Sequence, residues 1–383
     1  MKNRVAVIGA GVSGLTTAVL LQQNGFQVSI YTNKHPLKEI KNPYFGSLFP
    51  SASVIPHSVF HPEINEIFKM SQLFFSKLHD LSFSGLINHE HFELFAFENP
   101  ESDYARLITG FKNLTDLKWH PKHPDIRLKS GWKFDCFFAD WTIYYPQLVQ
   151  SFLQNNGVFI SGTVDLNSYD SVQEDIIINC SGLGSAQIRE EEKPLILKGH
   201  LLKINNTVEL KSPSGNTVSY NFSPGPDLYA DSFGTPLDVY CYPRKNDWIL
   251  GGSRFKGTLD VQGNWVSEDK LSQQFPTQIE SVNSEIIKET FGKDLSEFTE
   301  KEYQYSYRYV RNKENGLRIE SDNAADRLVI HNYGHGGAGV TLSWGCAFNV
   351  LQMINEKVSI LNKNIDSEEV MNRLGKLLTK PQP

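Results

Sequence analysis

Cysteine is scarce in this chain of 383 residues, which contains only Cys136, Cys180, Cys241 and Cys346. No two of them form a Cys-x-x-Cys pair, so neither a zinc site nor a redox dithiol is indicated. Sparse, unpatterned cysteines are typical of buried apolar thiols in a reducing compartment. A Gly-x-Ser-x-Gly nucleophile elbow is also missing, which argues against a hydrolase that uses one.

Long apolar runs are missing as well. No stretch approaches 18 consecutive apolar residues, and glycine, serine and threonine interrupt the most apolar N-terminal stretch, residues 5–21. The sequence therefore predicts neither a membrane span nor a secretory leader. A net charge of -6 at pH 7 disfavours nucleic acid and anionic membrane surfaces as partners. The C-terminal Lys-Pro-Gln-Pro is not a peroxisomal address, so we expect a cytoplasmic protein.

The chain opens with a pattern typical of dinucleotide binding. A β-branched strand at residues 5–8 leads into a glycine-rich turn, a helical pattern and a second strand at residues 26–31. In Gly9-x-Gly11-x-x-Gly14, Gly9 permits the tight turn and Gly11 lets the backbone approach a pyrophosphate. Gly14 lets the helix pack close to the strand. The N–H groups of the first helical turn then face the phosphates; this turn includes Val12 and Ser13.

Two further segments follow expected strands of this domain. Asn33 stands where a carboxylate usually binds the ribose, and it could bind a hydroxyl or simply form a turn. The sequence leaves both readings open. The apolar strand at residues 176–179 ends at Cys180-Ser181-Gly182, and we place Ser181 and Gly182 at the cofactor.

Nucleotide-type elements thus open the chain, recur near its middle and close it. We expect a Rossmann-type α/β domain made of residues 1–45, 131–190 and 305–383, interleaved with a mainly antiparallel sheet-plus-helix domain made of residues 46–130 and 191–304. Periodicity is weak from residue 34 to residue 130 except for a strand at 89–95, and the last ten residues read as a frayed tail. The other expected helices are 141–155, 270–291 and 341–354, and the other expected strands are 158–160, 201–204, 238–242, 248–252 and 327–332.

The closing segment carries a specific resemblance. Residues 331–347 read HNYGHGGAGVTLSWGCA, which resembles the signature of the D-amino-acid oxidase and D-aspartate oxidase family. The opening glycine turn, residues 177–182, residues 198–200 and residues 250–252 also fall in that family's order. The resemblance covers the whole chain and is weakest over residues 34–130. It implies FAD, which we expect to be non-covalent because no cysteine or histidine stands in a recognisable attachment motif.

The resemblance places the flavin ring against the closing glycines. Glycines there remove side chains where backbone must approach a flat ring, and the following helix aims its positive end at the negative charge of a reduced flavin. The flavin residues implied are Gly336, Gly337, Gly339, Val340 and Thr341.

The resemblance also implies a substrate site. Arg308 matches the family's arginine that binds the substrate carboxylate, with Arg311 as the fallback, and a guanidinium fork suits a carboxylate. Tyr240 matches a tyrosine that binds the same carboxylate, whereas Tyr242 reads as a cross-strand aromatic residue. Pro236 stands where several members have a further tyrosine, in a segment (residues 212–234) that reads as a candidate lid. The backbone carbonyl of Gly337 is implied to accept a hydrogen bond from the amine.

The function implied is oxidative deamination of a D-amino acid. Substrate is expected between the domains, with hydride passing from Cα to flavin N5; an imine, then a 2-oxo acid and ammonia would form, and dioxygen would become hydrogen peroxide. The partners expected are thus a D-amino acid and dioxygen, with no nucleic acid and no membrane; oligomeric state is open, a homodimer being one option.

Other functions remain open from the sequence. A D-aspartate oxidase needs a second cation, for which Arg244, Lys245 and Arg254 are candidates. A glycine- or sarcosine-type amine oxidase is more distant. A non-enzymatic FAD-binding module is the option outside enzymes, because residues 34–53 and Pro236 depart from the family. His89-x-His91 has no third metal ligand in view, so we expect an exposed strand face and no metal site.

Overall fold

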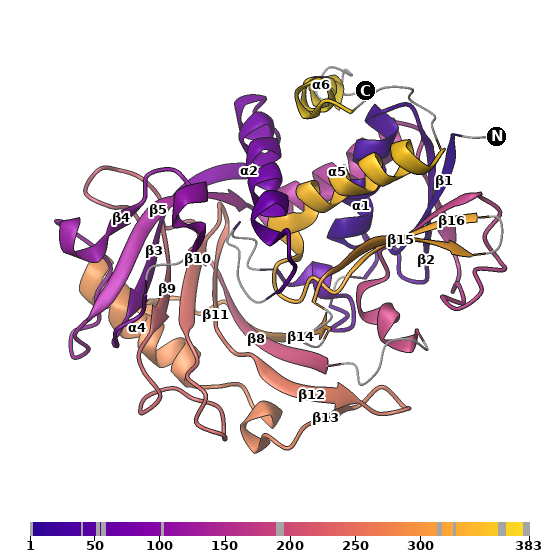
Figure 1. Cartoon of the computed structure of the whole chain (residues 1–383). Helices are drawn as coiled ribbons and strands as arrows, with labels where there is room; N and C mark the ends of the chain where they lie inside the picture. Colours follow the sequence, from indigo (N-terminus) through magenta and orange to yellow (C-terminus); the bar gives the residue numbers. More distant parts are fainter. Residues whose placement is uncertain are drawn as a thin grey trace. The chain divides into compact units, whose positions relative to one another are not determined.

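The computed structural model describes residues 3–39, 41–50, 54, 59–100, 103–188, 195–311, 316–324, 327–358 and 365–377 (Figure 1). The chain divides into two compact units of interleaved segments. The first unit is Met1–Leu86, Ala139–Leu195 and Arg308–Pro383, and the second is Ile87–Phe138 and Ile196–Tyr307. The sequence-based division differs most at residues 46–86, which it grouped with the substrate domain and which lie in the first unit. Of the expected frayed tail, residues 378–383 lie outside the described residues.

A parallel sheet forms the centre of the first unit. Within the described residues it has the order β15-β16-β7-β1-β2-β6, with β15 antiparallel to β16 at one edge. β1 pairs in parallel with both β2 and β7 because apolar β-branched residues allow burial on both faces. The strands are β1 (Arg4–Ile8), β2 (Gln27–Thr32), β6 (Val158–Ser161), β7 (Ile176–Asn179), β15 (Arg318–Ala324) and β16 (Arg327–Tyr333).

Helices pack beside this sheet. α1 packs against α3 and α5, and α5 also packs against α2 (Figure 1). α2 was not predicted, although its buried residues Ile67, Phe68, Phe74, Phe75 and Leu78 follow helical spacing. No helix in the described part of the chain is long and apolar enough to cross a bilayer. The helices are α1 (Val12–Gln23), α2 (Ile64–Asp80), α3 (Trp141–Gln154), α5 (Gly339–Val358) and α6 (Ser367–Arg373).

The second unit is a large, mainly antiparallel sheet with one long helix. The strand order is β13-β12-β8-β11-β10-β9-β3-β5-β4, and β14 pairs with β8. α4 (Gln278–Phe291) packs against β10 and β11. The helix expected over 270–291 is shorter, because Lys270–Gln273 forms a separate 3-10 turn before it. The strands are β3 (Leu86–Phe95), β4 (Lys112–Asn113), β5 (Ser130–Ala139), β8 (Leu195–Asn205), β9 (Val218–Ser223), β10 (Val239–Pro243), β11 (Asp247–Gly251), β12 (Phe255–Leu259), β13 (Trp265–Val266) and β14 (Lys301–Val310).

Candidate functional site

The glycine turn after β1 has the geometry that a phosphate cradle requires. Gly9 has a φ of +104°, and a Cβ there would lie 2.6 Å from the carbonyl oxygen of Cys180. A Cβ on Gly14 would collide with the carbonyl oxygen of Gly9. A Cβ on Gly11 would meet side chains alone, Ser47 at 2.9 Å from Oγ and the Phe45 ring at 3.9 Å. The nearby backbone therefore requires glycine at positions 9 and 14. At Gly11 the neighbouring atoms belong to side chains, which can move.

The first turn of α1 is prepared for an anion. Gly11 is the N-cap and supplies no side-chain cap, and no acidic residue lies in the first turn. The Val12 N–H donates to Ser47 Oγ at 3.0 Å, so an oxygen acceptor already occupies the position in front of this helix. Ser47 was not predicted, because it lies in a short 3-10 helix (Gly46–Leu48) with no motif of its own. An oxygen acceptor in front of an N–H group at a helix start occupies the kind of position that a phosphate oxygen takes.

Ser181 and Gly182 also lie at the carboxyl edge of the sheet. The backbone N–H and the hydroxyl of Ser181 donate to Asn179 Oδ1, at 3.1 and 2.7 Å. Asn33 lies past β2 with an exposed side chain and no hydrogen bond to any described residue. Its ribose role stays a prediction, and of the divergent residues 34–53, residues 40 and 51–53 lie outside the described residues.

The closing glycine segment connects β16 to α5 and reaches α1. His335 Nδ1 lies 3.4 Å from Ser13 Oγ, which links this segment to the phosphate-binding turn. His335 Nε2 is buried and has no hydrogen-bond partner among the residues that the structure describes. Burial lowers the pKa of His335 to about 4, so the ring is neutral near pH 7. A buried nitrogen in need of a partner, beside a helix start, fits the expected FAD.

The other residues that the sequence predicts to contact the flavin lie at the start of α5. Gly337 is exposed, Gly336 and Gly339 are half-buried, and Val340 and Thr341 are buried in the first turn of the helix. That turn contains no acidic residue. Both helix starts of the first unit named here thus lack a carboxylate that would repel a phosphate or a reduced flavin.

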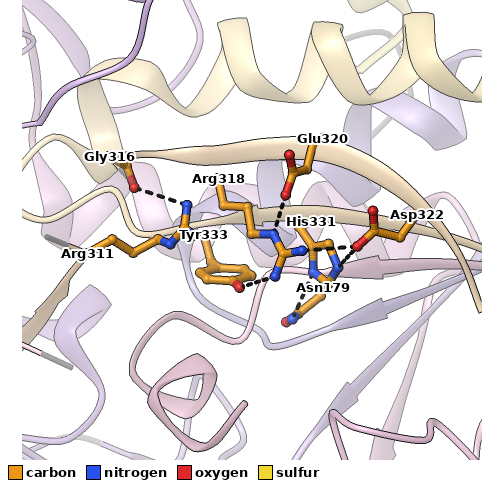
Figure 2. Close-up of polar contacts among 8 residues, drawn as sticks. All are labelled: Asn179, Arg311, Gly316, Arg318, Glu320, Asp322, His331 and Tyr333. Atoms are coloured by element: carbon orange, nitrogen blue, oxygen red, sulfur yellow. Dashed lines mark hydrogen bonds and ion pairs between the residues drawn. The ribbon is translucent and has the colours of Figure 1, made fainter. Parts of the chain in front are cut away.

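A buried arginine that the sequence analysis missed anchors the start of this segment (Figure 2). Arg318 on β15 donates to the Tyr333 hydroxyl at 2.8 Å, to Glu320 at 2.6 Å and to Asp322 at 3.0 Å. Asp322 also lies 3.1 Å from His331 Nε2. Burial alone would lower the pKa of Arg318, but its hydrogen bonds to Tyr333 and Glu320 outweigh burial and hold the pKa above its ordinary range. Tyr333 immediately precedes Gly334, so Arg318 fixes the residue from which the glycine segment departs.

Arg311 supports the same tyrosine from another direction. Its guanidinium lies 5.8 Å from the centroid of the Tyr333 ring and donates to the Gly316 carbonyl at 3.5 Å (Figure 2). Arg311 thus contacts the tyrosine that precedes the closing glycine segment, and its role as the fallback carboxylate ligand stays a prediction.

Arg308 lies on β14 between two buried aromatic residues. It is half-buried, whereas Tyr307 and Tyr309 are 4% and 5% exposed. Tyr309 packs against Tyr333, with ring centroids 6.3 Å apart. The fold thus brings the strand end that carries Arg308 into the same unit as the glycine segment with Gly337. Tyr240 belongs to the second unit, and its joint action with Arg308 on one carboxylate stays a prediction.

Tyr240 lies in a row of aromatic and polar residues. The rings of Tyr240 and Tyr242 are 5.0 Å apart, and Tyr242 is stacked with His91 at 5.8 Å, consistent with the cross-strand role expected for it. The structure corrects the expected exposure of the two histidines of β3, because His89 and His91 are 1% and 0% exposed. The error arose because alternation identifies the face of a strand and not what covers it. No metal-binding group of three or more ligands occurs among the described residues.

Two of the three cations considered for a second substrate carboxylate lie near counter-charges. Arg244 lies 3.7 Å from Asp247, and Arg254 forms an ion pair with Asp238. All four cysteines are buried and free, as expected of apolar thiols.

Comparisons with known proteins agree with FAD as the cofactor. A family model described as FAD dependent oxidoreductase matches residues 4–353. The chain is 24% identical over 355 residues to a D-amino-acid oxidase from Rubrobacter xylanophilus, covering 90% of this chain and 93% of the other. It is 25% identical to a human D-aspartate oxidase, covering 94% and 97%. Among solved structures, a glycine oxidase from Geobacillus kaustophilus matches with a TM-score of 0.63 at 14% identity, covering 93% and 95%, which shows a shared fold.

Proposed function

The chain belongs to the DAO family of FAD-dependent oxidoreductases, and on that premise we propose that it oxidises the amine-bearing carbon of a D-amino acid. The products are an imine, which hydrolyses to a 2-oxo acid and ammonia, and hydrogen peroxide formed from dioxygen. The partners proposed are a D-amino acid and dioxygen. Similarity to D-amino-acid oxidases at low identity supports the reaction class without naming the substrate.

The position of Arg308 carries the proposal. Arg308 is half-buried on β14, and its sequence neighbours Tyr307 and Tyr309 are buried; Tyr309 packs against Tyr333, the residue that precedes the glycine segment. Partial burial strengthens a charge-assisted pair with a carboxylate, and the planar fork fixes its orientation. Arg308 and Tyr240 would hold the substrate carboxylate, and the Gly337 carbonyl would accept a hydrogen bond from the amine. Bound FAD supplies the hydride acceptor, so the residues contribute mainly orientation.

Anaerobic bleaching tests this function directly. The FAD-loaded protein is mixed without oxygen with a panel of D-amino acids, with the L-enantiomers as matched controls, and the visible flavin absorbance is followed. We expect at least one D-amino acid to bleach the flavin and its L-enantiomer to leave it oxidised. Bleaching by glycine or sarcosine alone would favour the amine-oxidase alternative. A flavin that no amine or amino acid reduces would contradict the proposal and favour the non-enzymatic module.

A D-aspartate oxidase is the second candidate. Arg254 lies shortly after the strand that pairs with the strand of Tyr240, and it could bind a side-chain carboxylate. The ion pair with Asp238 already compensates the charge of Arg254. Arg254 would therefore bind an acidic side chain more weakly than an unpaired cation would.

A further inference from the structure

The sheet of the second unit has two chemically different faces. One face is apolar and includes Phe92, Phe222 and Val239 in a core that also contains residues of α4. Successive side chains of a strand point to opposite faces, so the neighbours of these residues lie on the other face. That face carries polar and aromatic residues: His89, His91, Glu93, Ser219, Asn221, Tyr240 and Tyr242.

Three residues of the polar face form one row across three strands. Tyr240 on β10 is paired with Asn221 on β9, and Asn221 is paired with Glu93 on β3. Neighbouring strands lie about 4.8 Å apart, so the Cα atoms of Tyr240 and Glu93 are separated by about 10 Å. A carboxylate bound at Tyr240 and a group at the end of a long side chain can therefore meet opposite ends of this row.

Hydrogen bonds hold the row in place. The Tyr242 hydroxyl donates to Asn221 Oδ1 at 2.7 Å, and Asn221 Nδ2 donates to Glu93 Oε1 at 2.8 Å. His91 Nε2 lies 3.2 Å from the same carboxylate oxygen. Glu93 is 4% exposed. The network thus orients a buried carboxylate on the face that carries Tyr240, and His91 is the titratable group that pairs with this carboxylate when the imidazole is protonated.

His89 is a second, independent sign of a ligand on this face. Its ring is stacked on Phe138 at 4.3 Å, and Phe138 is stacked on Tyr242. Neither ring nitrogen of His89 has a hydrogen-bond partner in the part of the chain that the structure describes. Burial, with a smaller contribution from His91, lowers the pKa of His89 to about 3, so one nitrogen is an acceptor near pH 7. The polar face therefore contains a neutral, buried imidazole without a hydrogen-bond partner among the described residues, on the same strand as Glu93.

We propose that Glu93 determines substrate specificity, and that the preferred substrates are D-amino acids with a long cationic side chain ending in an amine or a guanidine. The assignment rests on the proposed function, because it takes Tyr240 as a carboxylate ligand. A cation at the Glu93 end of the row meets an oriented carboxylate, whereas an acidic side chain meets a like charge. An uncharged side chain of similar length gains neither effect.

Three D-amino acids and two matched variants test the assignment. The rate and substrate dependence of anaerobic flavin reduction are measured with D-arginine, D-norleucine and D-glutamate. Glu93→Gln removes the charge and keeps the shape. Glu90→Gln is the control, because Glu90 is on the opposite face of β3, paired with Lys133 at 2.5 Å.

The expected result is a change in a ratio. Wild type should prefer D-arginine to D-norleucine in the ratio of the flavin-reduction rate constant to the substrate dissociation constant, with D-glutamate the poorest. Glu93→Gln should reduce the D-arginine to D-norleucine ratio by about tenfold to a hundredfold, since each tenfold corresponds to about 1.4 kcal/mol. Glu90→Gln should leave the ratio unchanged. A general structural defect would lower the efficiency of flavin reduction equally for both substrates and leave the ratio unchanged.

The outcomes separate this assignment from the proposed function. Efficient bleaching by D-norleucine with no preference for D-arginine overturns the role of Glu93 and leaves the D-amino-acid oxidase proposal standing. The wild-type ratios alone give this answer even if Glu93→Gln does not fold. An unchanged ratio in a folded Glu93→Gln variant also overturns it. No bleaching by any D-amino acid overturns both.

Discussion

The glycine segments of the first unit and the polar sheet face of the second unit are built in different ways. The glycine segments, residues 9–14 and residues 334–339, are each a single short stretch of sequence. Backbone geometry decides their function, as the collision of a Gly14 Cβ with the Gly9 carbonyl illustrates. On the sheet face, Glu93, Asn221 and Tyr240 come from three distant strands, and their side chains decide what binds. Short local motifs thus identify the cofactor, whereas the substrate depends on which strands become neighbours.

Gly11→Asp should break the first half of this comparison most severely. The new carboxylate would lie at the N-cap of α1 against the pyrophosphate, and two like charges about 4 Å apart at the protein surface cost about 4 kcal/mol, or about three orders of magnitude in affinity. The flavin-to-protein ratio after purification and FAD titration of the apoprotein measure the loss. Gly11→Ala is the steric control and should lose far less, since Ser47 can move aside. A full flavin complement in Gly11→Asp would refute the phosphate assignment.

Arg308→Ala should separate substrate binding from cofactor binding. Truncating one partner of a buried charge pair costs about 2–5 kcal/mol, so the substrate requirement should rise by about two to three orders of magnitude with FAD content unchanged. Arg308→Lys should restore little, because an ammonium lacks the bidentate fork. Steady-state kinetics with the best D-amino acid gives the answer.

Controls for Arg308 come from its own strand and from Arg311. Lys301, also on β14, is paired with Glu280, and Lys301→Ala should leave the kinetics unchanged. Because Arg311 packs on Tyr333, Arg311→Ala should weaken FAD binding and leave the substrate requirement near that of the wild type. If Arg311→Ala raises the substrate requirement and Arg308→Ala does not, the assignment of this strand is wrong.

His89→Leu should sharpen the description of the sheet face through its pH dependence. The folded-state pKa of His89 is lowered to about 3, below the unfolded value of 6.5, so the unfolded state binds more protons between these values. The contribution of this lowered pKa to the free energy of unfolding is fully present above about pH 6.5. It is lost as the pH falls, so that the wild type is about 2 kcal/mol less stable at pH 5. Urea midpoints should show the variant gaining stability relative to wild type at pH 5 but much less at pH 8. An equal difference at both pH values would count against a neutral buried imidazole.

Tyr333→Phe should have the smallest effect on the cofactor site. It removes the hydroxyl that accepts from Arg318, a charge-assisted hydrogen bond worth about 1.5–3 kcal/mol, part of which water can replace. We expect FAD to bind about tenfold more weakly, corresponding to about 1.4 kcal/mol. Tyr303→Phe is the matched control, since its hydroxyl donates to Glu280 in the second unit. Unchanged FAD affinity in Tyr333→Phe would mean that Arg318 does not position the glycine segment.

Much of the first unit was predictable because its signals are local. The strands expected at 5–8 and 26–31 lie within one residue of β1 and β2, and the helical pattern expected between them is α1. α2 was missed although its apolar residues are helical in period, since Glu63 at its N-cap makes no side-chain hydrogen bond that would mark its beginning. Arg318 was missed because its partners, Tyr333 above all, become neighbours only when β15 pairs with β16.

The sequence by itself determined the fold class and a dinucleotide cofactor, because glycine spacing and strand periodicity act over a few residues and survive without long-range information. That the dinucleotide is FAD was implied by the resemblance of the closing segment to a known family. Only the tertiary structure decided that His89 and His91 are buried, that Arg311 packs on the tyrosine before the closing glycine segment, and that Glu93 shares a row with Tyr240. These facts depend on strand register and on what covers each face. Both are set by contacts between residues that are distant in the sequence, more than a hundred positions apart for Glu93 and Asn221, and no local pattern encodes them.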